Sequence, residues 1–326
     1  MTSSSDGASL RLLTTLPLFA GVADDELELF TRVTRTVDVP QGALLWREGD
    51  EADGLHVIAS GKIKVETRLP GQRTLEIATL GHGGVLGEMP LLGGGQRWAT
   101  ATALEDSSLL FLGRVEFGGL VSGASPGALT VRRRLLAIVC DRLRQRHVAL
   151  ADWLGGARSS TAEPPAAPQR PADGAPAPRE DYVLRLPFFR SLDRAAAADV
   201  LQRASFLEAP AFCDLVGEAA PASGCWITIN GAVEELIRRG DEVIRVSLAG
   251  PGHAFGYLGL IDGLPSSVAA ATRERSLLLY LPPDEFEALF DPAVLAATAF
   301  RDAIQRDLVR ALRAAARPQA RLAAAR

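Results

Sequence analysis

The chain has 326 residues, of which 47% are hydrophobic, so it is long enough for about two domains with a core each. Its 35 Lys and Arg against 39 Asp and Glu leave a net charge of −4, which argues against a protein built mainly to coat nucleic acid. No apolar run reaches the roughly 20 residues that cross a bilayer, and Cys140, Cys213 and Cys225 form no CxxC pair. We therefore expect a cytoplasmic protein with no membrane segment, no metal site and no cofactor.

A first domain is expected at residues 11–125, after a Ser-rich segment (1–10) that we predict to be disordered. Helical periodicity runs from Asp24 to Arg35 and gives way to short segments of period two, which indicate β-strands. Turns with glycine, such as Ala59-Ser60-Gly61, separate these segments. We predict strands at residues 43–46, 55–58, 62–66, 74–80, 99–103 and 108–112. Many short strands with regular turns indicate a small β-roll, so the predicted fold class is mixed α+β and mainly β.

A long helix is predicted at residues 126–154. Four leucines of this helix follow a seven-residue spacing: Leu129, Leu136, Leu143 and Leu150. Such a spacing is typical of a coiled-coil seam, and it predicts a homodimer through this helix. The alternative is a helix that caps only its own domain.

A linker is predicted at residues 155–181. This segment is rich in Pro, Ala and Gly and has almost no aliphatic side chain that could hold it in place. It cannot bury enough apolar surface to offset the entropy of ordering it. We therefore expect it to be flexible and partly extended.

The chain then repeats itself over residues 182–292. Leu16-Pro17-Leu18-Phe19 returns as Leu186-Pro187-Phe188-Phe189, and Glu116-Phe117 returns as Glu285-Phe286, at nearly the same offset. Matches held in register over a hundred residues indicate two copies of one domain.

A C-terminal helix is predicted in the Ala/Arg-rich residues 293–326. Four arginines fall on one of its faces: Arg306, Arg310, Arg313 and Arg317. A basic helix of this kind contacts an acidic partner or nucleic acid, or is simply solvated. We expect Pro318 to end or kink it.

The chemistry of the first copy is expected in residues 86–101, after a glycine-rich turn. Gly87 lets the backbone approach a ligand closely. Glu88 can accept a hydrogen bond from a sugar hydroxyl, and Arg97 offers a planar fork for a phosphate. Together they suit a ligand with a hydroxyl donor and one negative charge. The alternative is that Glu88 and Arg97 pair with each other across a loop.

This segment resembles a known family. The pattern Gly-Glu-x-x-Leu-Leu, with an Arg nine residues after the Glu, is similar to the phosphate-binding cassette of cyclic nucleotide-binding domains. Such domains occur in catabolite activator-type regulators and protein kinase A regulatory subunits, and both copies in this chain resemble them.

The resemblance implies a role for each cassette residue. Glu88 would hold the ribose 2′-hydroxyl of cAMP or cGMP and Arg97 its cyclic phosphate. The backbone of Gly87, Met89 and Ala99 would line the pocket. Trp98 stands where the family usually has a small or hydroxyl-bearing residue, and it would either stack on the purine or crowd the phosphate site.

The second copy departs from this pattern. Gly256 keeps the glycine, but Tyr257 replaces the glutamate, and Ser266, followed by Ser267, replaces the arginine. A buried phosphate without a fixed positive charge loses about 1.5–3 kcal/mol per charged hydrogen bond. We therefore expect a degenerate second pocket, with a structural or interactive role.

The expected function is cyclic nucleotide sensing in signal transduction. The first domain would bind the ligand and signal to an unknown protein partner through movement of its helices. One alternative is a scaffold or interaction subunit in which both pockets are silent. Another is a transcription regulator; the sequence offers no helix–turn–helix, and we do not expect sequence-specific DNA binding. No catalytic arrangement of side chains suggests an enzyme.

Overall fold

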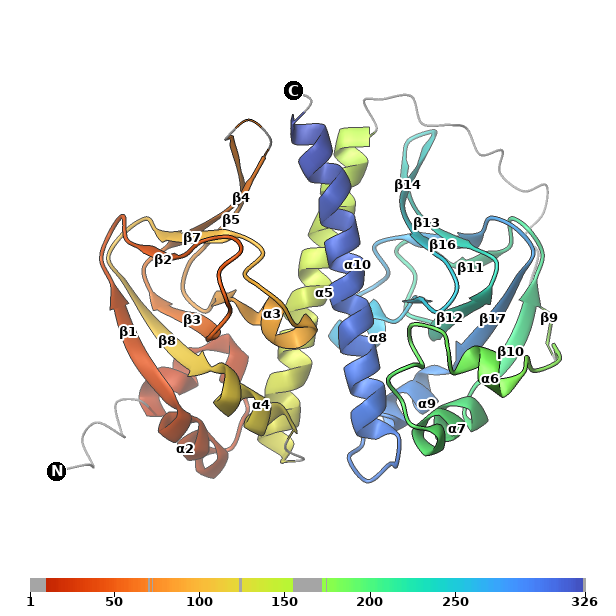
Figure 1. Cartoon of the computed structure of the whole chain (residues 1–326), viewed down its shortest axis with the longest axis horizontal. Helices are drawn as coiled ribbons and strands as arrows, with labels where there is room; N and C mark the ends of the chain where they lie inside the picture. Colours follow the sequence, from red (N-terminus) through yellow and green to blue (C-terminus); the bar gives the residue numbers. More distant parts are fainter. Residues whose placement is uncertain are drawn as a thin grey trace. The chain divides into compact units, whose positions relative to one another are not determined.

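Two compact units form the structure, which is a computed structural model. It describes residues 10–69, 71, 73–122, 125–154, 172–173 and 175–324. The units divide between Leu135 and Leu136, inside one long helix. The segment predicted to be disordered lies outside the described residues except for Leu10, which is helical. Each unit contains one β-roll (Figure 1).

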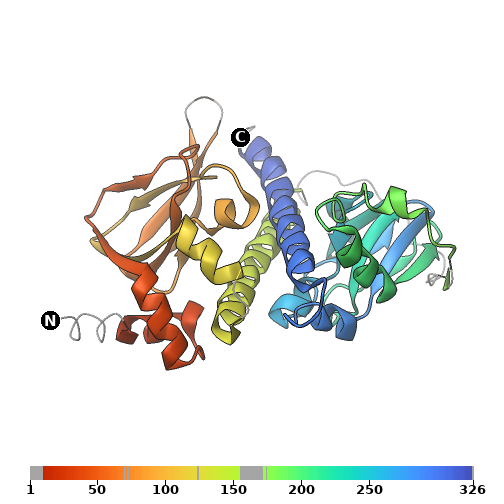
Figure 2. The ribbon, with the colours of Figure 1, turned by 60° about the horizontal axis from the view of Figure 1, so that its bottom comes forward.

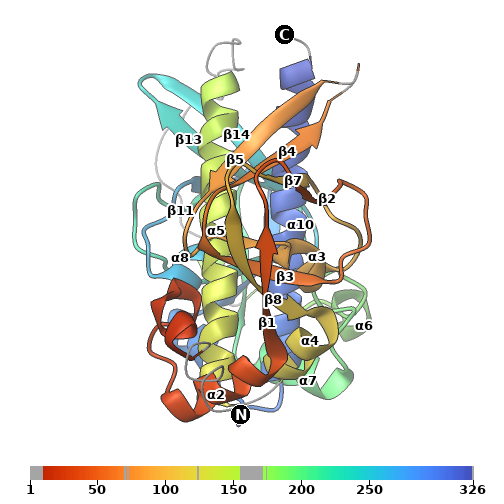
Figure 3. The ribbon, with the colours of Figure 1, turned by 90° about the vertical axis from the view of Figure 1, so that its left-hand side faces the viewer.

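Roll 1 belongs to the first unit and consists of two four-stranded antiparallel sheets, with strand orders β1-β8-β3-β6 and β2-β7-β4-β5. Successive side chains of a strand point to opposite faces, and burial alternates accordingly along β5. Side chains from both sheets, such as Ile58 and Ile63, form one core cluster. The two sheets therefore pack face to face. The strands of roll 1 are β1 (Thr34–Val39), β2 (Leu44–Trp46), β3 (Gly54–Ser60), β4 (Ile63–Arg68), β5 (Thr74–Leu80), β6 (Val85–Leu86), β7 (Thr100–Ala103) and β8 (Ser107–Gly113). Figures 2 and 3 show roll 1 from two further sides.

Roll 2 belongs to the second unit and repeats this arrangement. Its sheets have the orders β11-β16-β13-β14 and β15-β12-β17-β10-β9. Eight of its strands follow one another as in roll 1, and β9 is additional. The strands are β9 (Ala172–Asp173), β10 (Ser205–Ala209), β11 (Asp214–Val216), β12 (Cys225–Asn230), β13 (Val233–Arg239), β14 (Glu242–Ala249), β15 (Ala254–Phe255), β16 (Ala269–Thr272) and β17 (Ser276–Leu281). The predicted fold class, two β-rolls flanked by helices, is confirmed.

Short helices precede and follow each roll, and one long helix follows each. In α2, three acidic residues of the first turn interact favourably with the positive end of the helix dipole. The helices are η1 (Pro17–Phe19), α2 (Asp24–Val33), α3 (Glu88–Gly93), α4 (Arg114–Ser122), α5 (Pro126–Leu154), α6 (Glu180–Val183), α7 (Arg194–Gln202), α8 (Leu258–Asp262), α9 (Pro283–Ala288) and α10 (Ala297–Ala324). In the described part of the chain no helix is long and apolar enough to cross a membrane.

The predicted linker is partly ordered. Most of residues 155–181 lies outside the described residues. Near its end, however, β9 pairs with β10 through Leu207 and Glu208, and α6 begins at Glu180. Pairing with an existing sheet edge supplies the backbone hydrogen bonds that the composition of the segment does not predict. Of the residues predicted as a linker, those described are thus extended at β9 and helical from Glu180.

The predicted leucine seam is covered by the chain itself. Three of its four leucines are buried: Leu136, Leu143 and Leu150. Leu143 lines a pocket with Tyr257, and Leu150 packs in a cluster with Val268. A seven-residue period shows that one helix face is covered, but not by which partner. In this part of α5 the partner is the same chain, so a homodimer through Leu143 and Leu150 is not supported.

The C-terminal helix also differs from its prediction. α10 continues past Pro318 to Ala324, so the helix does not end at the proline. Two arginines of the predicted basic face bond within the chain, Arg306 to Ser191 and Arg310 to Asp307. Arg310 is thus paired with an acidic side chain, whereas Arg306 is exposed and donates to a neutral hydroxyl.

Phe212 and Ala219 of roll 2 have φ values of 62° and 60°, where roll 1 has Gly42 and Gly49. A left-handed conformation costs an L-residue about 1 kcal/mol or more. Replacing such a residue by glycine removes this cost, but the greater entropy of glycine in the unfolded chain offsets part of the stabilisation. Ala219→Gly is therefore expected to raise the free energy of unfolding by about 0.5–1 kcal/mol, measured by urea unfolding. The converse change, Gly49→Ala, should lower the free energy of unfolding. If the stability of both variants equalled that of the wild type, the backbone at these positions would not be strained.

Candidate functional site

The cassette of roll 1 begins where β6 meets α3. Gly87 lies between them with φ +78° and ψ 9°, a left-handed conformation that glycine adopts without strain. The turn places Glu88 at the start of α3, where the whole residue is buried. Met89 is buried beside it. A carboxyl group and the backbone of the cassette thus meet in the interior of roll 1.

Arg97 lies in the segment before β7. Its backbone is fixed by two hydrogen bonds to the preceding loop, Arg97 N to Asp50 O at 2.8 Å and Gly49 N to Arg97 O at 2.9 Å. Its side chain is only 1% exposed. The guanidinium donates from Nη2 to Asp53 Oδ1 at 2.5 Å and from Nη1 to the carbonyl of Gly87 at 3.3 Å.

An indole covers the guanidinium. The Cζ atom of Arg97 lies 4.0 Å from the centroid of the Trp46 ring, a cation–π contact. Trp46 is itself held by a hydrogen bond from its Nε1 to the carbonyl of Ala99, at 2.9 Å. The buried Nε of Arg97 has no hydrogen-bond partner among the described residues. Nη1 and Nη2 of the guanidinium therefore donate hydrogen bonds within the chain, whereas its buried Nε does not.

The electrostatics of the site follow from burial. Burial lowers the pKa of Arg97, and the carboxylate of Asp53 opposes this shift; an arginine stays charged at neutral pH. Burial and, secondly, the charge of Arg97 lower the pKa of His56 to about 4. His56 lies between Trp46 and Phe111, with ring centroids 5.2 and 4.8 Å away. At neutral pH the site therefore holds one buried cation and a neutral imidazole.

The structure brings most of the predicted residues to one place. Gly87, Glu88 and Arg97 lie together, since Arg97 bonds to Gly87 and Glu88 acts electrostatically on Arg97. Ala99 is buried and bonded to Trp46. Trp98 is half-buried; the indole that covers the guanidinium is that of Trp46, so the position of Trp98 relative to a ligand stays a prediction.

Sequence reasoning missed three residues of the site: Trp46, Asp53 and His56. Asp53 is 44 positions from Arg97, so no local spacing could show the ion pair. A signal did exist for Asp53, because the segment Gly49-Asp50-Glu51-Ala52-Asp53 also resembles the cyclic nucleotide-binding domains.

The second cassette has the same backbone and different side chains. Gly256 has φ +78°, like Gly87. Ser266 makes the backbone bonds that Arg97 makes in roll 1, here with Ala219 and Ala220, both at 2.8 Å. Its hydroxyl donates to the carbonyl of Val268 at 2.7 Å, and Ser267 beside it is half-buried. No guanidinium takes the place of Arg97 in this cassette.

A buried tyrosine replaces the glutamate in the second cassette. Tyr257 is 2% exposed, and its hydroxyl donates to Asp307 at 3.2 Å. Burial raises its pKa well above the ordinary value, so the phenol stays protonated and neutral. The two cassettes therefore share a backbone and differ in charge.

Comparison with known proteins agrees with this geometry. The family model of the cyclic nucleotide-binding domain matches two segments, residues 36–123 and 207–292, which together make up just over half of the chain. Each segment covers most of one roll and its cassette. The chain belongs to the cyclic nucleotide-binding domain family, with two tandem copies.

Among curated proteins, the chain is similar to the cyclic AMP receptor protein of Thermus thermophilus. The two are 38% identical over 136 residues, which is 41% of this chain and 60% of that protein. A cyclic nucleotide-gated potassium channel of Rhizobium etli is 34% identical over 126 residues, 39% of this chain and 34% of the channel. The chain thus matches about three fifths of the first relative's length and a third of the second's.

Solved structures with a similar fold include the regulatory domain of Toxoplasma gondii PKA with cAMP. That comparison covers 88% of this chain and 93% of the other at 18% identity, with a TM-score of 0.35. A cyclic nucleotide-binding domain from Methylobacillus flagellatus covers 48% of this chain and 86% of its own at 23% identity, with a TM-score of 0.40.

Proposed function

We propose that the first domain binds a cyclic nucleotide, cAMP or cGMP, and that the chain regulates a partner in response. Family membership supports cyclic nucleotide sensing or regulation in general; the ligand, its residues and the signalling step are our proposal. The observation that carries it is the buried guanidinium of Arg97, whose Nε has no hydrogen-bond partner in the described part of the chain. Buried donors are normally satisfied, and a charged one suits an anion.

The roles follow from the chemistry of each group. Arg97 would donate to the cyclic phosphate. Asp53, its counter-ion, has a side chain that is 70% exposed, so the ion pair is partly solvated and gives up little when the guanidinium also contacts a phosphate. The buried Glu88 would accept from the ribose 2′-hydroxyl. The backbone of Gly87, Met89 and Ala99 would line the pocket.

The experiment compares the two cassettes. Wild-type protein should be stabilised by cAMP or cGMP, by about 2.7 kcal/mol at a concentration one hundred times the Kd, measured as a shift in Tm. Arg97→Gln is expected to weaken binding by about tenfold or more, since a charged hydrogen bond is lost. Ser266→Ala, at the equivalent position of roll 2, should leave the shift unchanged. Equal responses of the two variants would contradict the assignment.

A second candidate is a scaffold that binds no nucleotide. The observation in its favour is the ion pair between Arg97 and Asp53, which already neutralises the guanidinium. Calorimetric titration with both nucleotides separates the two functions, because a scaffold releases no heat of binding.

A further inference from the structure

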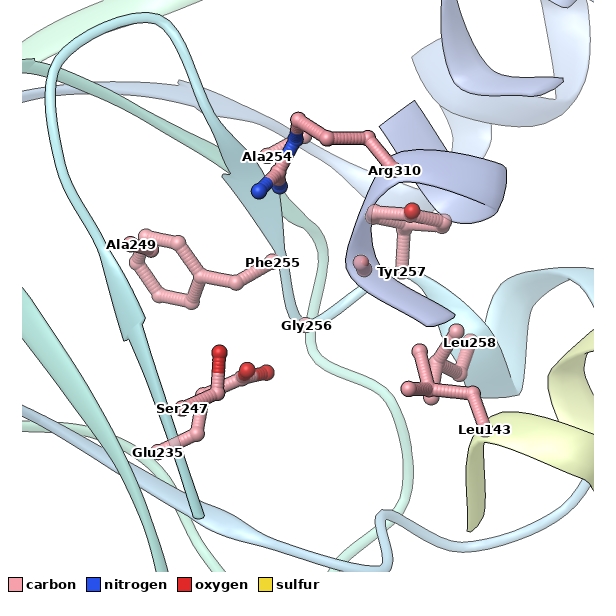
Figure 4. A pocket seen from close by; sticks show the side chains of 11 residues that line it. Leu143, Glu235, Ser247, Ala249, Ala254, Phe255, Gly256, Tyr257, Leu258 and Arg310 are labelled. Carbon is pink, nitrogen blue, oxygen red and sulfur yellow. The ribbon is translucent and has the colours of Figure 1, made fainter. Parts of the chain in front are cut away.

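The pocket of roll 2 is occupied by side chains of the same chain. A cavity of about 20 Å³ remains between roll 2, its cassette and the two long helices, which is room for about one or two water molecules. Figure 4 shows Tyr257 and Arg310 near α10, with Glu235 and Ser247 across the pocket from them. Burial raises the pKa of Glu235. A nucleotide could enter only if some of these groups moved.

The contact with α10 runs through a buried carboxylate. The side chain of Asp307 is 5% exposed. Its Oδ2 accepts from the hydroxyl of Tyr257 at 3.2 Å, and its Oδ1 accepts from Arg310 Nε and Nη2 at 3.0 and 2.9 Å. Tyr257 stands where the other copy has Glu88. The residue that replaces the sugar-binding carboxyl therefore binds the C-terminal helix instead.

The contact with α5 runs through Arg144, in the half of this helix that belongs to the second unit. Arg144 Nε and Nη2 donate to the two carboxylate oxygens of Asp262 at 2.9 and 3.0 Å, and Nη1 donates to the carbonyl of Pro265 at 2.6 Å. Both side chains of the pair are buried, at 11% and 6% exposed. Asp262 ends α8, so this bidentate pair ties α5 to the same cassette.

Apolar packing adds to this contact. Leu150 and Ala151 of α5 are buried in a cluster with Ile237, Ile244, Val246 and Val268 of roll 2. A ligand can shift the arrangement of these helices only by its different affinity for two arrangements. In roll 2 a nucleotide would have no fixed cation at Ser266 to bind and would have to displace Arg310 and Tyr257.

We propose that roll 2 holds the second half of α5 and α10 in one arrangement without any ligand, through the cluster Arg144, Asp262, Tyr257, Asp307 and Arg310. The degenerate cassette is thus a binding site for the chain's own helices. The proposal concerns the second unit alone and stands whether or not roll 1 binds a nucleotide.

Hydrogen–deuterium exchange of the full chain tests it. With excess cAMP or cGMP, exchange in α8, in residues 136–154 and in α10 should be unchanged. Tyr257→Phe, which removes one hydroxyl, is expected to speed exchange in α10 by about tenfold. Arg144→Met should speed exchange in α8 and in residues 136–154 by about a hundredfold or more, because it leaves Asp262 buried and uncompensated.

The matched control is Arg275→Met, which removes an exposed ion pair with Glu208 on roll 2 and should change none of these rates. Slower exchange of α8 or α10 in wild-type protein with nucleotide would overturn the proposal, as would a Tyr257→Phe variant that exchanges like the control. If Arg144→Met does not fold, Tyr257→Phe decides. Exchange of residues 85–99 reports separately on nucleotide binding in roll 1. If nucleotide left their exchange unchanged, the proposed function would fail while the proposal for roll 2 would stand.

Discussion

Gly87→Ala is expected to abolish nucleotide-dependent stabilisation and to destabilise the first unit by about 2 kcal/mol. The first reason is the backbone, since φ +78° costs an L-residue about 1–2 kcal/mol. The second is space. A Cβ at this position would overlap Nη1 of Arg97 and lie 3.0 Å from the carbonyl of Gly54. The guanidinium would have to leave the position that we propose for phosphate binding.

Gly256→Ala is the matched control for this change. Gly256 has the same φ of +78°, and its Cβ would lie 2.9 Å from Cδ1 of Trp226. The backbone strain is therefore the same, the crowding is milder, and no guanidinium is displaced. We expect a loss of stability of about 1–2 kcal/mol from the backbone, measured by urea unfolding, and an unchanged Tm shift with cAMP or cGMP. If Gly87→Ala kept the nucleotide response of the control, Arg97 would not be part of the binding site.

The local alternation of residues was sufficient to predict most strands of roll 1. The strand predicted at residues 74–80 coincides with β5, because alternation over seven residues between glycine turns has few other interpretations. The strand β1 was missed because helical periodicity was extended to Arg35. The helix ends at Val33, and β1 begins at the next residue, Thr34. Where two periods overlap for a few residues, the sequence alone does not decide between them.

The leucine spacing in α5 shows a different limit. It correctly predicts a covered helix face, since Leu136, Leu143 and Leu150 are buried. It cannot identify what covers that face, because an intermolecular seam and an intramolecular contact require the same apolar spacing. The polar contacts of Arg144 are what identify the partner, and Asp262 is 118 residues away. Such a long-range pair leaves no periodic signal.

In the candidate site, too, residues close in sequence were predicted and residues far apart in sequence were not. Gly87, Glu88 and Arg97 lie within one short segment, so their motif was visible. Asp53 and Trp46 come from earlier loops and strands and meet Arg97 only after the sheets have formed. The counter-ion and the aromatic cover of the guanidinium therefore follow from the fold, and neither was predicted from the sequence.

Acid is expected to destabilise the first unit through His56, whose pKa is about 4 in the folded chain and about 6.5 when unfolded. Between these values the unfolded chain binds more protons than the folded chain, so stability rises with pH across this window and is fully present above about 6.5. Lowering the pH from 7 to 4.5 should remove about 2.5 kcal/mol through this group alone. His147 in the second unit has a similarly lowered pKa of about 4, but burial raises the pKa of Glu235 in the same unit, which acts in the opposite direction.

His56→Phe isolates this effect, because phenylalanine keeps an aromatic ring between Trp46 and Phe111 and does not ionise. Urea unfolding of the wild type and the variant at several pH values gives two stability curves. Their difference should fall by about 2.5 kcal/mol between pH 7 and 4.5. A constant difference between wild type and His56→Phe would mean that His56 takes up a proton in the folded site, next to Arg97. The charge of Arg97 helps to keep His56 neutral. Adding Arg97→Gln should therefore raise the pKa of His56 and reduce the acid sensitivity that His56 contributes. This measurement thus reports on the same guanidinium that we propose binds the nucleotide.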